Sequence, residues 1–333
     1  MIVDFHTHFL PHEFPAQPPG IEEPAWPRMV STGQASATMY VGSREFRSFD
    51  DQYWNVARRV EALDRAGVDI QVMSPLPEVL SYWLNPQAAA IITDSVNQYA
   101  ADMVAQAPTR LRALGVVALQ DVDVAVRQLQ TIKDLGLSGV LLGSNVNGKS
   151  VASAEFEPIY AKAQELELIL FVHGIRPAGL DRMVGPGLMG AVLGIPHENA
   201  MVIASFMMTD ILGRYPNLKL VFSHGGGSIG AMLDRMTHIW DKFPAMRETL
   251  TISPSEYARR FYYDTAIFGS RYLSYLADRF GPDRICAGSD GPTEIGQTNL
   301  EAFVTDAGLG DAARDGILGG NAARLLASSG VSV

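Results

Sequence analysis

Short apolar runs alternate with longer amphipathic stretches along most of the 333-residue chain. The runs place Val, Ile, Leu and Phe on consecutive positions, as strands that are buried on both faces of a parallel sheet do. The longer stretches carry apolar residues at helical spacing, and several of them end at Gly or meet a following Pro. The pattern predicts eight strands, at residues 2–5, 69–73, 113–119, 139–142, 168–172, 218–223, 261–264 and 284–288.

Predicted helices separate these strands, and the clearest of them cover residues 54–67, 86–107, 122–136 and 154–167. Alternation of buried strands with helices is typical of a parallel sheet, and eight repeats predict a closed (β/α)8 TIM barrel of the α/β class. A doubly wound open sheet is the alternative fold. Because no charged linker, low-complexity tract or repeat divides the chain, we expect one domain over residues 1–333.

Residues 9–52 interrupt the alternation, because they separate the first strand from its helix by a long segment rich in Pro and polar residues. Loops of this length in compact domains are usually functional or disordered. The segment leaves the carboxyl end of the first strand, where barrel enzymes keep their active sites. We therefore expect a long loop insertion that folds over the active site.

The composition of the chain limits the kinds of partner that the protein can bind and the cellular compartment in which we expect it. A formal net charge of −10 and the lack of a basic run oppose a nucleic-acid partner. One cysteine, Cys286, excludes an internal disulfide, and together with the lack of a signal-peptide pattern it favours a cytoplasmic protein. The most apolar long stretch, residues 183–196, is too short and too rich in Gly and Pro to span a membrane as a helix. We expect it to form a loop and a pocket wall.

Histidines are concentrated where the predicted strands end. His6 and His8 are separated by one residue, so the period of two places them on the same side of a strand. Such a pair alone is more often two ordinary surface or hydrogen-bonded histidines. However, His173, His224 and Asp290 end the fifth, sixth and eighth predicted strands, and the carboxyl ends of barrel strands converge on one face. This convergence favours a metal site.

Neutral imidazoles and one carboxylate suit zinc or another divalent ion, which polarises a substrate oxygen or lowers the pKa of a bound water. Catalysis also needs a group that moves protons. We expect His6, His8, His173 and Asp290 to hold one ion, Zn2+ first and Mn2+ as the alternative. His224 is then left as the acid or base, and Asp290 can also relay a proton through its second oxygen.

Taken together, the motifs resemble those of the amidohydrolase superfamily, and within it the decarboxylase branch typified by aminocarboxymuconate-semialdehyde decarboxylase. The matching motifs are "HTH" at 6–8, "FR" at 46–47, "SPLPEVLSYW" at 74–83, "FVH" at 171–173, "HGGG" at 224–227, "YYDTA" at 262–266, "GSD" at 288–290 and "GNAARLL" at 320–326. The resemblance implies a metal-dependent, non-oxidative decarboxylation that needs no organic cofactor. It also assigns the metal to His6, His8, His173 and Asp290, and a catalytic role to His224.

The substrate-binding positions agree less well with that branch. Its members hold the substrate carboxylate with arginines, and Arg47 matches one of them. The next expected arginine falls near Asp50, and Phe243 stands near the place of an arginine that a neighbouring subunit would offer. We therefore expect a different substrate.

Three residues are expected to contact this substrate, and each has an alternative role. Arg47 either meets an anionic group or forms a structural ion pair with Asp50 and Asp51. Arg176 is either a relocated cation beside the metal or part of a surface salt bridge. Trp83 either lines the pocket or belongs to the core.

The sequence thus predicts a homodimeric barrel enzyme that acts on a small carboxylated aromatic or unsaturated acid. Decarboxylation is the leading hypothesis. A metal-dependent hydrolase or hydratase for a C–C bond, amide or lactone is the second, because the same kind of site can activate water. A metal-binding barrel without catalysis is the third, and the intact ligand set with a spare histidine argues against it.

Overall fold

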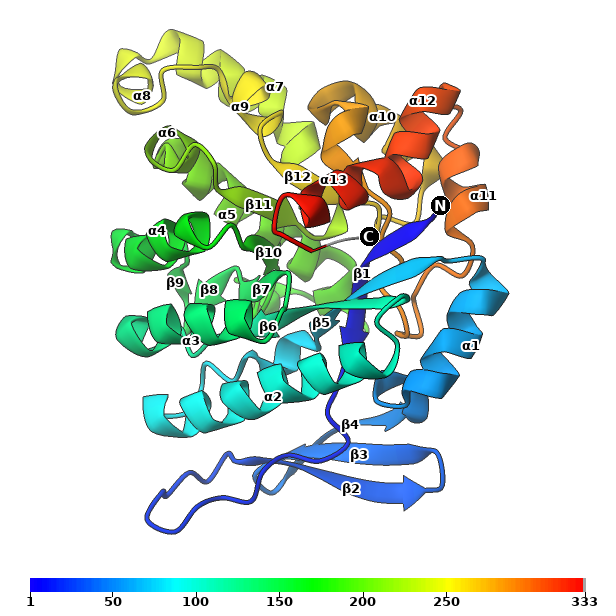
Figure 1. Cartoon of the computed structure of the whole chain (residues 1–333). Coiled ribbons are helices and arrows are strands. Elements are labelled where there is room, and N and C mark those ends of the chain that lie inside the picture. Colours follow the sequence, from blue (N-terminus) through cyan, green and yellow to red (C-terminus); the bar gives the residue numbers. More distant parts are fainter. Residues whose placement is uncertain (332–333) are drawn as a thin grey trace.

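The structure is a computed structural model, which describes residues 1–331 of the chain. Eight parallel strands form one sheet in the order β1-β5-β6-β7-β10-β11-β12-β13. The backbone N–H of Phe5 donates to the Ala287 carbonyl and that of His8 to the Gly291 carbonyl, each at 2.7 Å, so the first strand meets the last. The predicted (β/α)8 barrel is confirmed (Figure 1).

All eight predicted strands are present, with shifted ends. They are β1 (Val3–Phe9), β5 (Ile70–Pro75), β6 (Leu111–Val116), β7 (Gly139–Gly143), β10 (Ile169–His173), β11 (Lys219–Phe222), β12 (Tyr262–Asp264) and β13 (Ile285–Cys286). The first strand is longer than predicted, so His6 and His8 lie within it. The last strand is shorter than predicted and ends at Cys286, although Asp290 and Gly291 still form hydrogen bonds with the backbone of β1.

Helices cover the outside of the barrel. The longer ones are α1 (Val56–Ala66), α2 (Pro86–Gln106), α3 (Val122–Asp134), α4 (Glu157–Glu165), α5 (Ile195–Met208), α7 (Ile229–Lys242), α10 (Ser270–Phe280) and α13 (Asn321–Ala327). The shorter ones are α6 (Ile211–Arg214), α8 (Pro244–Thr249), α9 (Pro254–Ala258), α11 (Leu300–Thr305) and α12 (Asp311–Asp315). The starts of α1, α2 and α3 are capped by Asn55, Asn85 and Asp121, whose side chains accept hydrogen bonds from backbone N–H groups.

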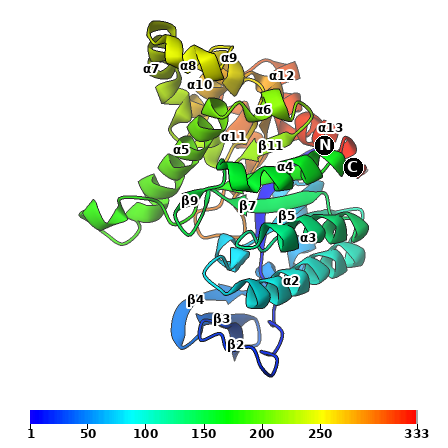
Figure 2. The ribbon, with the colours of Figure 1, turned by 90° about the vertical axis from the view of Figure 1, so that its left-hand side faces the viewer.

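The segment at residues 9–52 is not the irregular loop that its composition predicts. It contains a three-stranded antiparallel sheet of β2 (Pro27–Gly33), β3 (Ser36–Val41) and β4 (Arg44–Asp50). This sheet lies beyond the barrel end to which β1 points (Figures 1 and 2). Met39 and Phe49 are buried and anchor it, since alternate positions of β3 and β4 face the core. A second small sheet pairs β8 (Asn145–Val146) with β9 (Lys149–Ser150).

The apolar stretch at residues 183–196 was expected to be a loop, and this expectation is wrong for its second half. A short π-helix, Gly190–Gly194, runs directly into α5, because Pro196 is tolerated in the first turn of a helix. Within residues 1–331 the combined helix Gly190–Met208 is the one long and apolar enough to cross a membrane by length and composition, and 44% of its most apolar window is buried. The start of this helix and the residues before it form an arm that projects from the barrel (Figure 2).

Candidate active site

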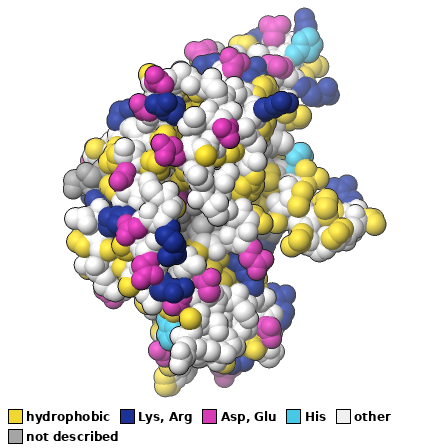
Figure 3. Space-filling view, turned by 90° about the vertical axis from the view of Figure 1, so that its right-hand side faces the viewer, with side chains coloured by type: hydrophobic (Ala, Val, Ile, Leu, Met, Phe, Trp, Pro, Cys, Tyr) yellow, Lys and Arg dark blue, Asp and Glu magenta, His cyan; other side chains and the backbone are white. Residues whose placement is uncertain are grey.

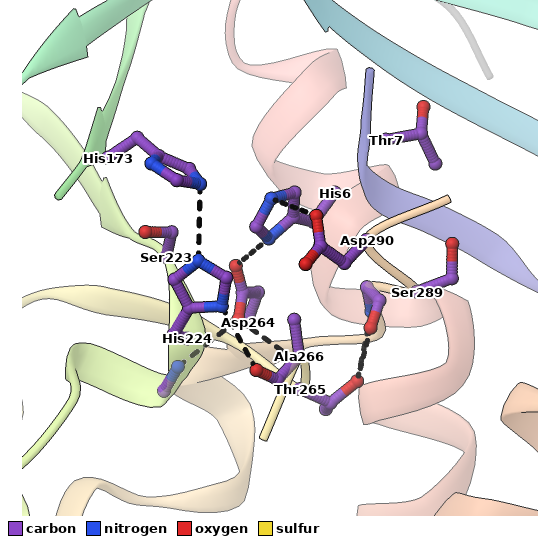
Figure 4. A network of polar contacts seen from close by, with 12 residues as sticks. His6, Thr7, His173, Ser223, His224, Asp264, Thr265, Ala266, Ser289 and Asp290 are labelled. Carbon is purple, nitrogen blue, oxygen red and sulfur yellow. Dashed lines mark hydrogen bonds and ion pairs between the residues drawn. The ribbon is translucent and has the colours of Figure 1, made fainter. Parts of the chain in front are cut away.

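The five residues that the sequence predicts to converge lie together in the structure, and we call them the histidine cluster: His6, His8, His173, His224 and Asp290. Figure 4 shows His6, His173, His224 and Asp290 of this cluster. The Nε2 atoms of His6 and His8 are 3.2 Å apart, and those of His173 and His224 are 3.1 Å apart. Asp290 Oδ1 lies 3.2 Å from His8 Nε2 and 3.5 Å from His6 Nε2. Ligand atoms of His6, His8 and His173 all lie within 4.8 Å of one another, so these buried histidines can hold a metal ion.

The second ring nitrogen of every histidine in the cluster has a partner outside the cluster. His173 Nδ1 lies 2.9 Å from the Gly174 carbonyl oxygen, and His224 Nδ1 lies 3.1 Å from the Ala266 carbonyl oxygen. Because a carbonyl oxygen only accepts, Nδ1 donates in both rings and Nε2 of the neutral ring carries a lone pair. This tautomer is the one that a metal-ligating histidine needs.

The two histidines of β1 are oriented by side chains. His6 Nδ1 lies 2.6 Å from Oδ2 of Asp264, which is fully buried at the end of β12. His8 Nδ1 lies 3.2 Å from Ser74 Oγ at the end of β5. Asp264 is itself fixed, because its Oδ1 accepts hydrogen bonds from the backbone N–H groups of Gly225 and Ala266. Neighbouring strand ends thus hold the rings in place.

The donor set of the cluster fits a divalent cation. The Nε2 atoms of His173 and His224 face each other at 3.1 Å, and two neutral rings of this tautomer would oppose their lone pairs there. A cation or a proton between the rings removes that repulsion. Three imidazoles and one carboxylate are the ligand types that zinc prefers, and other divalent ions also accept them.

The electrostatics of the cluster favour neutral rings at His8 and His173 and an ionised carboxylate at Asp290. Burial lowers the pKa of His8, and burial together with the other histidines holds the pKa of His173 well below its usual range. Burial disfavours the charged form of Asp290, but the hydrogen bond with His8 and the charge of His6 outweigh it and keep the pKa of that carboxyl low. Burial likewise opposes protonation of His6, yet Asp264 outweighs it and raises the pKa of that ring.

Unusual backbone conformations deliver two members of the cluster. His224 has a φ of 53° and Asp290 a φ of 65°, a region that residues with side chains rarely adopt. Glycine is needed in the turn after His224, because a Cβ on Gly227 would stand 1.6 Å from the Pro196 carbonyl oxygen. The "HGGG" motif therefore lets the turn after β11 pass against the start of α5.

A cavity of about 670 Å³ opens onto the histidine cluster. Its walls are mostly apolar and aromatic, as expected for a small-molecule site. The apolar side chains are Val41, Phe46, Phe49, Tyr53, Leu76, Leu80, Tyr82, Trp83, Ile175, Leu188, Ile195 and Ile295. Because residues of β4 contribute to this lining, the inserted sheet forms one wall of the cavity.

Three arginines also line the cavity, Arg44, Arg47 and Arg176, and we call them the arginine wall. The alternative role of Arg47, an ion pair with Asp50 or Asp51, is not seen within residues 1–331. Asp51 instead lies 3.6 Å from Arg58, and Asp50 accepts a hydrogen bond from the backbone N–H of Gln52. Arg47 therefore has no anionic partner in the described chain.

Arg176 and Trp83 lie against each other in the cavity. The Arg176 guanidinium stands 5.0 Å from the centre of the Trp83 ring, a cation–π arrangement, and it donates to Asn147 Oδ1 at 3.4 Å. Burial and the nearby charge of Arg44 lower the pKa of Arg176. A salt bridge, the alternative role of Arg176, is absent from the described residues. Trp83 is half-buried and lines the pocket.

Sequence reasoning missed Arg44 and Glu78, which also line the cavity. In a regular strand, positions 44 and 47 point to opposite faces. The pairs Met39↔Arg47 and Tyr40↔Glu45 show one extra residue on β4, and this bulge reverses the alternation between the two arginines. No sequence signal marks the bulge. Glu78 had a signal, since it is the one charged residue in the apolar stretch "SPLPEVLSYW".

The fold and this site together define a metal-dependent (β/α)8-barrel enzyme. A family model described as Amidohydrolase matches residues 3–327. The chain belongs to the amidohydrolase family.

Its relatives include decarboxylases. The chain is 30% identical over 327 residues to 2-amino-3-carboxymuconate-6-semialdehyde decarboxylase of Dictyostelium discoideum, a match that covers 97% of this chain and 91% of that protein. The solved structure of 5-carboxyvanillate decarboxylase from Sphingomonas paucimobilis has 25% identity and a TM-score of 0.75, over 81% of this chain and 82% of the other. The fold also matches dihydroxybenzoic acid decarboxylase from Polaromonas sp. JS666, solved with bound manganese and the inhibitor 2-nitroresorcinol, at 22% identity and a TM-score of 0.74, over 81% and 85% of the chains.

Proposed function

We propose that the protein is a metal-dependent, non-oxidative decarboxylase of a small aromatic or unsaturated carboxylic acid. The observation that carries the proposal is that one cavity joins the histidine cluster to arginines that have no anionic partner in the described part of the chain. An acid bound there would meet complementary charge along one wall and the cluster at its base. The similarity to decarboxylases along nearly the whole chain supports the same reaction.

One divalent ion would be held by His6, His8, His173 and Asp290, and no organic cofactor would be needed. We favour Zn2+ for this donor set, with Mn2+ as the alternative because a decarboxylase of the same fold was solved with manganese. When bound, the ion would polarise an oxygen of the substrate.

His224 would supply the proton that replaces CO2. When the C–C bond to the carboxylate breaks, its electron pair stays on the substrate carbon, which must then take up a proton. His224 Nδ1 is bound to the Ala266 carbonyl, so its Nε2 is the nitrogen left to exchange a proton. Asp290 contacts His6 and His8 through Oδ1, which leaves Oδ2 free to relay that proton.

Arg47, Arg176 and Trp83 would bind the substrate. The two guanidinium groups offer planar, bidentate hydrogen bonding to carboxylate oxygens. Trp83 would pack against the planar carbon skeleton of the substrate, and its ring also contacts the Arg176 guanidinium. Arg44, which lies near Arg176, would add a further positive charge at the mouth.

A substrate screen tests the reaction. The protein would be stripped with a chelator, reloaded with zinc or manganese, and offered hydroxybenzoates, muconate-like acids, amides and lactones. CO2 release and hydrolysis would be measured separately on each compound. We expect an acid that yields about one CO2 per molecule consumed, whereas turnover of amides or lactones without CO2 would favour the hydrolase hypothesis.

The projecting arm supports a homodimer. Its exposed apolar side chains include Val184, Leu188 and Val192, which are 97%, 74% and 66% exposed, and Figure 3 shows hydrophobic side chains gathered on the projection. Such a patch is larger than the isolated apolar residues of most monomer surfaces. Leu188 also lines the cavity, so a second copy on the arm would help to close the mouth. Sedimentation should give a dimer that Val192→Asp weakens, and a monomer in the unaltered protein would contradict the assignment.

A further inference from the structure

Glu78 is a carboxyl group that the described chain leaves without a partner inside the active-site cavity. It lies in the short 3₁₀ helix Pro77–Leu80, which directly follows β5. The next two residues, Val79 and Leu80, are fully buried, and the turn is fixed by the hydrogen bonds from Leu76 N to Phe9 O and from Val79 N to Leu76 O. The carboxyl is therefore held at the cavity wall by a rigid turn.

Within residues 1–331, no other residue forms a hydrogen bond or ion pair with the Glu78 carboxylate, whose one hydrogen bond is with its own backbone N–H. Glu198, a buried acid on α5, differs from Glu78 in this respect. Its oxygens accept hydrogen bonds from Ser144 Oγ, Asn145 Nδ2 and the Ala178 backbone N–H. Polar groups in a protein interior normally have such partners. Glu78 is partly exposed at the cavity wall, so its carboxylate is open to a partner among the molecules that fill the cavity.

The charged neighbours of Glu78 place it between the two functional parts of the cavity. Arg47 of the arginine wall favours its ionised form, and Asp290 of the histidine cluster opposes it. Burial is the largest influence and raises the pKa of Glu78. Arg47 forms no ion pair with Glu78 within residues 1–331, and all three residues line the cavity, so a ligand atom can lie beside the Glu78 carboxyl.

We propose that Glu78 accepts a hydrogen bond from a hydroxyl or amino substituent of the substrate, so that the enzyme selects planar acids that carry such a donor. The inference rests on the proposed function, because the acid group is assigned to the arginine wall and the histidine cluster. A methoxy group at the same ring position offers no donor and would place an oxygen lone pair against the Glu78 carboxylate. A site built for a donor strongly rejects an analogue that lacks it.

Calorimetric binding to the metal-loaded protein tests this preference without requiring turnover. The probes are 2-, 3- and 4-hydroxybenzoate, 2- and 3-aminobenzoate, and the three matching methoxybenzoates. For at least one ring position we expect the hydroxy acid to bind roughly ten- to a hundredfold tighter than its methoxy partner, the usual worth of a hydrogen bond to a charged group. Glu78→Met, which has similar size but no strong acceptor, should abolish most of that difference. Glu78→Gln, which keeps a neutral acceptor, should retain part of it.

Glu294→Gln is the matched control, because Glu294 lines the same cavity but is exposed at its rim. It removes one negative charge from the cavity and should leave the hydroxy-to-methoxy ratio unchanged. Metal content and melting temperature, measured on every variant, would identify a protein that fails to fold, and either Glu78 variant alone is sufficient for the test.

Three results would overturn the inference: no hydroxy preference in the unaltered protein, an unchanged preference in a folded Glu78 variant, or an equal loss for hydroxy and methoxy acids. The last result would mean that Glu78 only orients Arg47. A parallel assay of CO2 release separates the two proposals. Decarboxylation without a Glu78-dependent preference contradicts this inference alone, and a Glu78-dependent preference without CO2 release from any acid contradicts the proposed function alone.

Discussion

The histidine cluster and the arginine wall share one cavity but differ in how their polar groups are satisfied. Every ring of the cluster is bound through Nδ1 to a residue outside it, and Asp290 lies against His6 and His8. On the arginine wall, Arg47 and Arg176 have no acidic partner within residues 1–331, and Glu78 in the same cavity has no hydrogen-bond donor from another residue of this range. The cluster is organised before any substrate arrives, whereas the wall is completed by what binds to it. Variants should therefore separate chemistry from recognition.

The largest effect is expected from the ligands of the cluster. His173→Ala or Asp290→Ala removes one of four donors, so metal content should fall below about one ion per chain and CO2 release should fall with it. Elemental analysis and turnover would be measured on the same preparation. If both variants kept full occupancy, the assignment of these ligands would be wrong.

The next effect is expected from His224, which we place beside the metal as the proton carrier. His224→Asn keeps similar size but cannot carry a proton in the same way, so kcat should fall by roughly 10²–10⁴-fold while the metal stays bound. Loss of metal in proportion to activity would make His224 a ligand instead. Near-normal turnover in a fully metallated variant would deny it any role in proton transfer.

A smaller effect is expected behind the cluster, at Asp264. Asp264→Asn keeps the shape of the side chain but weakens the 2.6 Å contact that orients His6. Loss of such an orienting partner typically lowers metal affinity or activity by roughly 10–100-fold. Competition with a chelator would measure the affinity, and Ser289→Ala, a change at another buried polar residue near β1, serves as the comparison. An unchanged affinity would show that the His6 ring is held without Asp264.

The arginine wall should respond through substrate binding alone. Arg47→Ala removes a charge-assisted hydrogen bond to an anionic group, at a cost of roughly 1.5–3 kcal/mol, so KM should rise about ten- to a hundredfold. Metal content should not change, because Arg47 belongs to β4 of the inserted sheet and not to a barrel strand. Normal kinetics combined with earlier melting would instead assign Arg47 to the stability of that sheet.

The two parts of the cavity also differ in how far the sequence predicted them. The cluster followed from simple geometry, because residues such as His173 and Asp290 stand at or just after strand ends, and strand ends converge in a closed barrel. The wall depends on details that periodicity does not encode. The segment that forms the inserted sheet is rich in Pro and polar residues, so its composition does not predict strands. The bulge in β4 places Arg44 and Arg47 on the same face. The position of Arg176 depends on its own φ of 41° and on its packing against Trp83. Both are defined only in the folded chain.

A metal titration of the metal-free protein measures whether one ion in the histidine cluster is required for decarboxylation. Protein stripped with a chelator would receive increasing zinc or manganese, and CO2 release from a saturating acid identified in the screen would be followed at each step. We expect no CO2 without metal, a linear rise with added ion, and a break at about one ion per chain, since four converging donors satisfy one site. CO2 release that did not depend on metal, or a break at two ions per chain, would show that the histidine cluster is not a single-metal catalytic site.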